Sequence, residues 1–119
     1  MLRTLTATIG AIGLLVSSQA FAHAALKVSA PASGATVAAP HDLSLTFSEK
    51  VRLTAVRLTA GGKDVSGVQV DRGAQAAPTF TVPLPHLAPA KYEVRWSVLG
   101  DDGHPVNGTF TFTVSTAAS

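Results

Sequence analysis

An aspartate and a histidine two positions apart, Asp102 and His104, are the side chains in this sequence best suited to chemistry. Residues i and i+2 of an extended segment project to the same side of the backbone, so the carboxylate and the imidazole can converge on one point. The pair fits two interpretations: two ligands of one metal ion, or two polar residues of a solvated hairpin loop. Aspartate and glycine are also ordinary turn residues, so the spacing alone does not decide between them.

A further candidate ligand lies near the start of the chain, where residues 1–22 read as a secretory signal peptide. An apolar region from Leu5 to Val16 precedes the small residues of Ala20-Phe21-Ala22. Cleavage after Ala22 would make His23 the first residue, and its free amine and Nδ1 could then chelate one metal ion. An α-amine titrates with a pKa of about 7.7–8.0, so a metal displaces few protons from it. Ala22-His23-Ala24 is a second cleavage register that would discard the histidine, and both registers stay open at this point.

The composition limits the classes of partner and of metal chemistry. Removing 22 of the 119 residues leaves 97, which is enough for one domain with a single core. This remainder carries eight basic and seven acidic residues, a balance that argues against nucleic acid or an anionic membrane surface as a partner. No second apolar run approaches the length of a membrane span, so we expect no membrane insertion. The chain has no cysteine, and its one methionine is Met1, so soft sulfur ligands are excluded.

The elements that must position these side chains are predicted to be strands, because apolar and polar residues alternate nearly throughout. About seven strands are expected: Leu26–Val28, Leu43–Phe47, Val56–Thr59, Val68–Val70, Thr79–Leu84, Tyr92–Val98 and Thr109–Val114. Pro83 marks its strand as an edge or an early end, and Ala74–Pro78 reads as an irregular loop. No amphipathic helix longer than a turn is expected. This pattern predicts an all-β, antiparallel β-sandwich with Greek-key connections.

Five blocks of the sequence together resemble the CopC family of periplasmic copper-resistance proteins. The blocks are His23–Leu26, Pro31–Gly34, Leu45–Glu49, Tyr92–Val98 and Asp102–Phe110, and they occur in the family's order and spacing. The resemblance implies an immunoglobulin-like sandwich that binds Cu(II) in the bacterial periplasm. It also favours cleavage after Ala22, which divides the chain into a signal peptide, 1–22, and a copper-binding domain, 23–119.

The resemblance further implies a copper site built from His23, Asp102 and His104, with Glu49 nearby. Cu(II) prefers nitrogen and oxygen ligands in tetragonal geometry. The amine and Nδ1 of His23, one nitrogen of His104 and one oxygen of Asp102 would supply three nitrogens and one oxygen. Glu49 is expected outside this set, bonded to a ligand or a water. The methionine-rich Cu(I) site of some family members is expected to be absent.

Each residue also has a structural interpretation. His23 can also be interpreted as a frayed terminus, and Glu49 as a solvated charge at a strand end. Asp101 is interpreted as an acid of the loop. His41 and His86 lie beside prolines in turn-like stretches and are interpreted as surface loop residues, whereas Trp96 is expected in the core.

Three classes of function remain after this reading. The first is a non-enzymatic carrier or buffer of copper, whose partner would be an inner-membrane copper transporter. The second is a copper-dependent redox enzyme of the terminal-histidine type, which uses two histidines and an open coordination position. The third is an immunoglobulin-like interaction module without metal, which the fold alone would permit. We favour the carrier, because Asp102 is expected to fill the position that the enzyme would need open.

Overall fold

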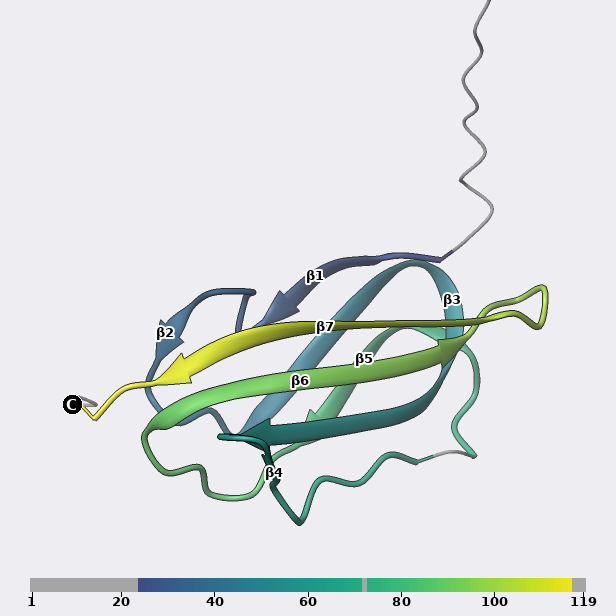
Figure 1. The fold of residues 1–119 in the computed structure, drawn as a ribbon. Helices are drawn as coiled ribbons and strands as arrows, with labels where there is room; N and C mark the ends of the chain where they lie inside the picture. The colour runs from purple at the N-terminus through teal and green to yellow at the C-terminus, as the bar shows by residue number, and fades with distance from the viewer. Residues whose placement is uncertain (1–23, 72, 117–119) are drawn as a thin grey trace, which may run out of the picture.

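The computed structural model describes residues 24–71 and 73–116, which form strands joined by loops and contain no helix. The seven strands are β1 (Leu26–Ala30), β2 (Thr36–Val37), β3 (Asp42–Ala60), β4 (Lys63–Asp64), β5 (Ala77–Pro83), β6 (Ala90–Leu99) and β7 (Pro105–Val114) (Figure 1). The predicted all-β class is therefore confirmed. Within the described ranges there is no helix long and apolar enough to cross a membrane.

The 19-residue strand β3 connects two sheets. Its first part pairs antiparallel with β1 and β5, for example Leu45 with Phe80. Its second part pairs antiparallel with β4 and β6, for example Leu58 with Val94. Between the two parts the register with β5 shifts, after Thr46 and before Val51. The chain bends there and crosses from one layer of the sandwich to the other (Figure 1).

The second sheet is completed by the long hairpin of β6 and β7 and by the short strand β2. The hairpin runs in unbroken antiparallel register from Ala90 opposite Val114 to Leu99 opposite Pro105. On its far side, β2 pairs with β7 in parallel. This pair is a parallel exception within the predicted antiparallel sandwich. Every other strand pair in the described ranges is antiparallel.

Alternate residues of the long strands fill the space between the layers. The inner face of β3 contributes Leu43, Leu45 and Phe47, and none of the three is more than 2% exposed. From the opposite layer, Trp96 meets Phe47 edge-on with ring centroids 5.2 Å apart. Burying a side chain of this size stabilises the fold by about 1.5–3 kcal/mol. No charged side chain is buried among the described residues, so the core is apolar.

The count of seven strands agrees with the sequence, but the strands are not all those expected. The stretches 43–47 and 56–59 are two parts of the single strand β3. The predicted strand Val68–Val70 is wrong: this segment forms no ladder, although both valines pack against the core. Any extended segment alternates its side chains, with or without a partner strand. The two-residue strands β2 and β4 are too short to leave a pattern.

Two smaller predictions concern β5. Pro83 is its last residue, and β5 pairs with β3 alone among the described strands, so the expectation of an edge strand is confirmed. The irregular loop expected over Ala74–Pro78 is shorter than predicted, because β5 begins at Ala77.

Candidate metal centre

Asp102 and His104 converge in the loop that joins β6 to β7. Oδ2 of Asp102 lies 3.0 Å from Nδ1 of His104. Oδ1 accepts a hydrogen bond of 3.0 Å from the backbone N–H of His104. Both side chains face solvent, with 48% of Asp102 and 70% of His104 exposed. The structure thus confirms that the two groups meet. The contact uses Nδ1 of the imidazole, so Nε2 points away from Asp102.

The spacing in the sequence predicts that an extended segment brings the two side chains together. In the structure a turn does so instead. An aspartate that accepts the N–H two residues ahead mimics a backbone turn. Two backbone bonds close the loop around it: Gly103 N–H donates to Gly100 O, and Gly100 N–H donates to His104 O, both at 2.9 Å. Gly103 has φ of 87°, a left-handed conformation that suits glycine. The loop itself therefore fixes the aspartate against the histidine.

These contacts also set the charge of the pair. The pKa of Asp102 is lowered from its usual 3.8, first by the backbone N–H of His104 and then by the His104 side chain. Hydrogen bonds to a carboxylate favour its ionised form. Asp102 is therefore an anion throughout the neutral range, as a ligand for a cation must be.

A second set of contacts places the beginning of β1 at the same end of the sandwich. Ser48 N–H donates to Ala25 O at 2.8 Å, and Ala25 N–H donates to Ser48 Oγ at 3.0 Å. Ala24, the first described residue, is 4% exposed and belongs to the core. Figure 1 shows this start of β1, the bend of β3 and the β6–β7 loop at one end of the molecule. His23 itself lies outside the described residues.

Glu49 lies in the bend of β3, next to Ser48, and its side chain is exposed. It therefore occupies the same end of the molecule, but it forms no hydrogen bond or ion pair with Asp102 or His104. Within residues 24–71 and 73–116, no three histidine, aspartate or glutamate side chains gather closely enough to hold a metal ion. Of the predicted copper ligands, the described part of the chain contains Asp102 and His104, which lie in contact.

The remaining candidates have structural positions. His41 and His86 are exposed in loops, as predicted, and lie at the opposite end of the sandwich from Asp102. Trp96 is 6% exposed and belongs to the core, also as predicted. Its Nε1 is buried without a hydrogen-bond partner among the described residues.

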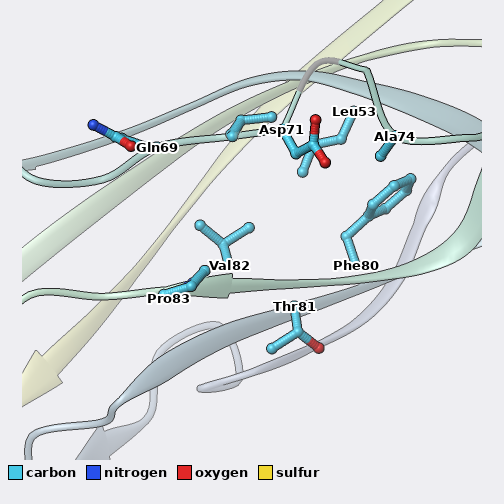
Figure 2. A pocket seen from close by; sticks show the side chains of 9 residues that line it. Leu53, Gln69, Asp71, Ala74, Phe80, Thr81, Val82 and Pro83 are labelled. Atoms are coloured by element: carbon cyan, nitrogen blue, oxygen red, sulfur yellow. The ribbon is translucent and has the colours of Figure 1, made fainter.

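A hollow beside strand β5 has no metal-binding character. It measures about 500 Å³ and lies between strand β5 and the segment around residues 69–74 (Figure 2). Asp71 is the only acidic or histidine side chain in its lining, and its Oδ1 accepts the N–H of Gly73 at 2.9 Å. Phe80 and Val82 face the same space, so the hollow is mostly apolar (Figure 2).

Ser48, which anchors the start of β1, is a residue that the sequence did not single out. It stands inside the block Leu45–Glu49, directly before the glutamate. A serine next to a charged residue at a strand end has no distinctive pattern. Its role depends on a contact with Ala25, 23 residues earlier, which only the fold brings about.

Comparison with known proteins identifies the family. The model of the CopC domain matches residues 26–115, which includes all seven strands. The chain belongs to the CopC family. The resemblance seen in the sequence is thereby confirmed.

Two curated CopC relatives carry the name copper resistance protein C. The protein from Xanthomonas campestris pv. juglandis is 36% identical over 111 residues, covering 84% of this chain and 86% of its own. The protein from Escherichia coli is 34% identical over 115 residues, covering 88% and 91%.

Solved structures show the same fold. CopC from Methylosinus trichosporium OB3b superimposes with a TM-score of 0.68 at 32% identity, covering 78% of this chain and 94% of its own. PcoC from Escherichia coli, described as a methionine-rich copper resistance protein, gives a TM-score of 0.64 at 34% identity, covering 78% and 99%. The likeness to PcoC does not extend to its methionines, because Met1 is the only methionine in this chain.

Proposed function

We propose that this protein is a carrier or buffer of Cu(II) in the bacterial periplasm and is not an enzyme. The metal would be held by the amine and Nδ1 of His23, by Nε2 of His104 and by an oxygen of Asp102. This set of three nitrogens and one oxygen matches the ligand preference of Cu(II). The family membership supports copper as the metal, because the CopC relatives are named for copper resistance.

The observation that carries the proposal is the contact between Asp102 and His104. With Nδ1 of His104 facing Asp102 Oδ2 at 3.0 Å, Nε2 is the ring nitrogen left for a metal. Each carboxylate oxygen has two lone pairs, so Asp102 can hold His104 and still bind a cation. A carboxylate that orients a ligating histidine is a common feature of metal sites.

The position of β1 supports the participation of His23. Ala25 is anchored by two hydrogen bonds to Ser48, in the bend of β3. His23 precedes Ala25 by two residues, and consecutive Cα atoms are about 3.8 Å apart. The described chain thus begins, at Ala24, at the end of the molecule that carries the loop (Figure 1). Glu49, adjacent to Ser48, is proposed to act outside the ligand set, through a hydrogen bond to a ligand or a water.

The exposure of the loop favours carriage over catalysis. With 70% of His104 exposed, a partner can reach the bound ion directly. The four proposed protein donors would complete a tetragonal ligand set and would reserve no position for a substrate. The proposed partner is an inner-membrane copper transporter, and the proposed location follows from export of the chain with cleavage after Ala22.

Electron paramagnetic resonance of the Cu(II)-loaded mature protein tests this function. We expect a single tetragonal signal with three nitrogens, and loss of one nitrogen in His104→Ala. The signal should not support turnover when ascorbate and oxygen are added. Sustained oxygen consumption would overturn the carrier in favour of the redox enzyme, and failure to bind Cu(II) would leave the interaction module.

A further inference from the structure

A small basic hollow adjoins the candidate metal loop. It measures about 200 Å³ and lies where β3 leaves its bend and passes the β6–β7 loop. Lys50 and Arg52 line it from β3, and Gly100, Asp101 and Gly103 line it from the loop. The pairing of Arg52 with Leu99 holds the two walls together. The hollow therefore borders the same five-residue loop that carries Asp102 and His104.

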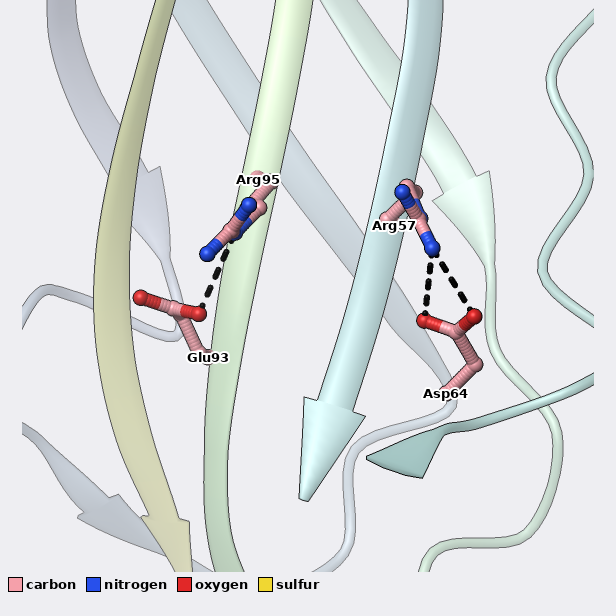
Figure 3. Close-up of polar contacts among 4 residues, drawn as sticks. All are labelled: Arg57, Asp64, Glu93 and Arg95. Carbon is pink, nitrogen blue, oxygen red and sulfur yellow. Dashed lines mark hydrogen bonds and ion pairs between the residues drawn. The ribbon is translucent and has the colours of Figure 1, made fainter. Parts of the chain in front are cut away.

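The two cations of this hollow are not neutralised by the protein. In the part of the chain that the structure describes, neither Lys50 nor Arg52 forms an ion pair or a side-chain hydrogen bond. The arginines on the open face of the second sheet differ (Figure 3). There, Arg57 contacts Asp64 at 2.8 Å and Arg95 contacts Glu93 at 3.3 Å. As residues i and i+2 of a strand, Lys50 and Arg52 project to the same side.

Cations outnumber acids among the residues that line the hollow, and Glu49, next to Lys50 in the chain, is not one of those residues. Asp101 is the one acid in the hollow's lining, against two cations. Asp102 does not line the hollow, and its carboxylate faces His104. A bound Cu(II) ion would add further positive charge at this end of the molecule. The hollow beside the loop is therefore electrostatically suited to an anionic group.

We propose that this hollow is the docking site for a carboxylate-rich segment of the protein that exchanges copper with this one. The inference rests on the proposed function and names the chemistry of the partner. Rim charges of opposite sign steer encounter and fix the register of a complex. Carboxylates guided to Lys50 and Arg52 would arrive beside His104, and oxygen ligands can accept Cu(II). Emptying the site removes positive charge, so the partner leaves more readily after exchange.

The docking site can be tested without copper. We would titrate ¹⁵N-labelled, metal-free protein with an oligo-aspartate peptide and follow amide shifts by nuclear magnetic resonance. Shifts should concentrate at residues 50–52 and 100–103. The double variant Lys50→Gln and Arg52→Gln should bind the peptide about tenfold more weakly, since two exposed ion pairs are lost. Binding should also weaken steeply with added salt.

A matched control removes the same charge elsewhere. The double variant Lys63→Gln and Lys91→Gln changes two exposed, unpaired lysines at the far end of the sandwich. It should bind the peptide as the wild type does. Equal weakening in both double variants would mean that net charge alone attracts the peptide, and it would overturn the docking site. Absence of peptide binding to the wild type would do the same.

A second measurement separates this inference from the function on which it rests. Stopped-flow fluorescence of Trp96 would follow transfer of Cu(II) from loaded protein to an aspartate-rich peptide that also carries two histidines, because nitrogen donors are needed to compete for Cu(II). Transfer should slow about tenfold in the Lys50→Gln and Arg52→Gln variant, with copper affinity unchanged. Unchanged transfer would overturn docking and leave the copper carrier standing. Peptide docking by a protein that binds no copper would overturn the carrier and leave a basic docking site for acidic segments.

Discussion

Asp102 holds His104 at two atoms, its backbone nitrogen and its ring Nδ1, each at 3.0 Å. The first contact closes a turn and the second orients the imidazole. The orientation is thus present without a metal, because the loop's own hydrogen bonds impose it. A ligand pair arranged in advance loses less conformational entropy when it binds an ion.

The first prediction concerns the acidity of Asp102 in the metal-free protein. Its pKa is lowered chiefly by the backbone N–H of His104 and secondly by the His104 side chain. In His104→Ala the backbone donor remains, so the pKa should rise and still stay below 3.8. Carboxyl titration by nuclear magnetic resonance measures this. A variant pKa at or above the usual value would show that the turn does not form in solution.

The sign of the accompanying stability change follows from the direction of the shift. A depressed pKa means that the folded state favours the ionised carboxylate. The stabilisation is fully present above the carboxyl's usual pKa and is lost as the pH falls through the folded value. Between pH 5 and 8 this group should leave the stability of the metal-free protein unchanged.

The second prediction separates metal binding from folding. His104→Ala should abolish tight Cu(II) binding and leave the melting temperature of the metal-free protein unchanged, because His104 is exposed and lies outside the core. As a contrast, Leu58→Ala should destabilise the fold by about 2–5 kcal/mol, since Leu58 is 1% exposed. Calorimetry and circular dichroism measure both. Disorder of the metal-free wild type would make the site structural and contradict the carrier.

The alternation of residues predicted the strands well where a partner strand exists. Tyr92 to Val98 and Phe110 to Val114 became the centre of the β6–β7 hairpin. Val68 and Val70 alternate in the same way but have no partner strand. An alternation with period two shows only that side chains point to opposite faces of an extended segment. Whether that segment joins a sheet depends on which other segment lies beside it. The continuity of β3 through its bend is equally a property of packing between two sheets.

The site was predictable as residue types and not as geometry. Asp102 and His104 were identified by their spacing, yet a turn brings them together where an extended segment was assumed. Gly108 lies outside this loop, within β7. Its lack of a side chain has another cause. A Cβ there would lie 2.6 Å from Cζ2 of Trp96, its partner across the strands.

The third prediction follows from that contact. Gly108→Ala should destabilise the protein by about 1–3 kcal/mol, because the buried indole must shift. Gly73→Ala is a matched control: its new Cβ would meet only Asp71 Oδ1 at 3.5 Å, an ordinary contact. That change should be neutral or slightly stabilising. Denaturant unfolding compares them, and equal stability of the two variants would show that Trp96 yields freely.

The fourth prediction concerns the anchor of β1. Ser48→Ala removes the acceptor of the Ala25 N–H, a bond of 3.0 Å. A hydrogen bond contributes about 0.5–1.5 kcal/mol, so Cu(II) affinity should fall by up to about tenfold. The number of nitrogens seen by paramagnetic resonance should stay the same. The control is Thr46→Ala, in the same strand as Ser48, which removes an exposed hydroxyl contact to Thr79 of β5. It should leave the affinity unchanged. Equal affinities in both variants would show that the anchor does not position a ligand.

The last prediction depends on a position and not on a residue type. If His23 chelates through its own α-nitrogen, one glycine placed before it converts that amine to an amide, which is a poor ligand unless its proton is lost. The new terminus is displaced by a full residue, about 3.8 Å between Cα atoms. Fold and imidazole remain, so the extended protein should melt normally, bind Cu(II) much more weakly and show fewer nitrogens in its resonance spectrum.

The same chemistry makes cleavage after Ala22 the step that creates the site. The uncleaved chain should bind copper as weakly as the glycine-extended form, and mass spectrometry of the exported protein should find His23 at its start. A mature chain beginning at Ala25 would refute the site, because both nitrogens of the proposed chelate would be gone. Equal copper affinity in the extended and native forms would instead refute the chelate alone, and would leave Asp102 and His104 as ligands without the terminal amine.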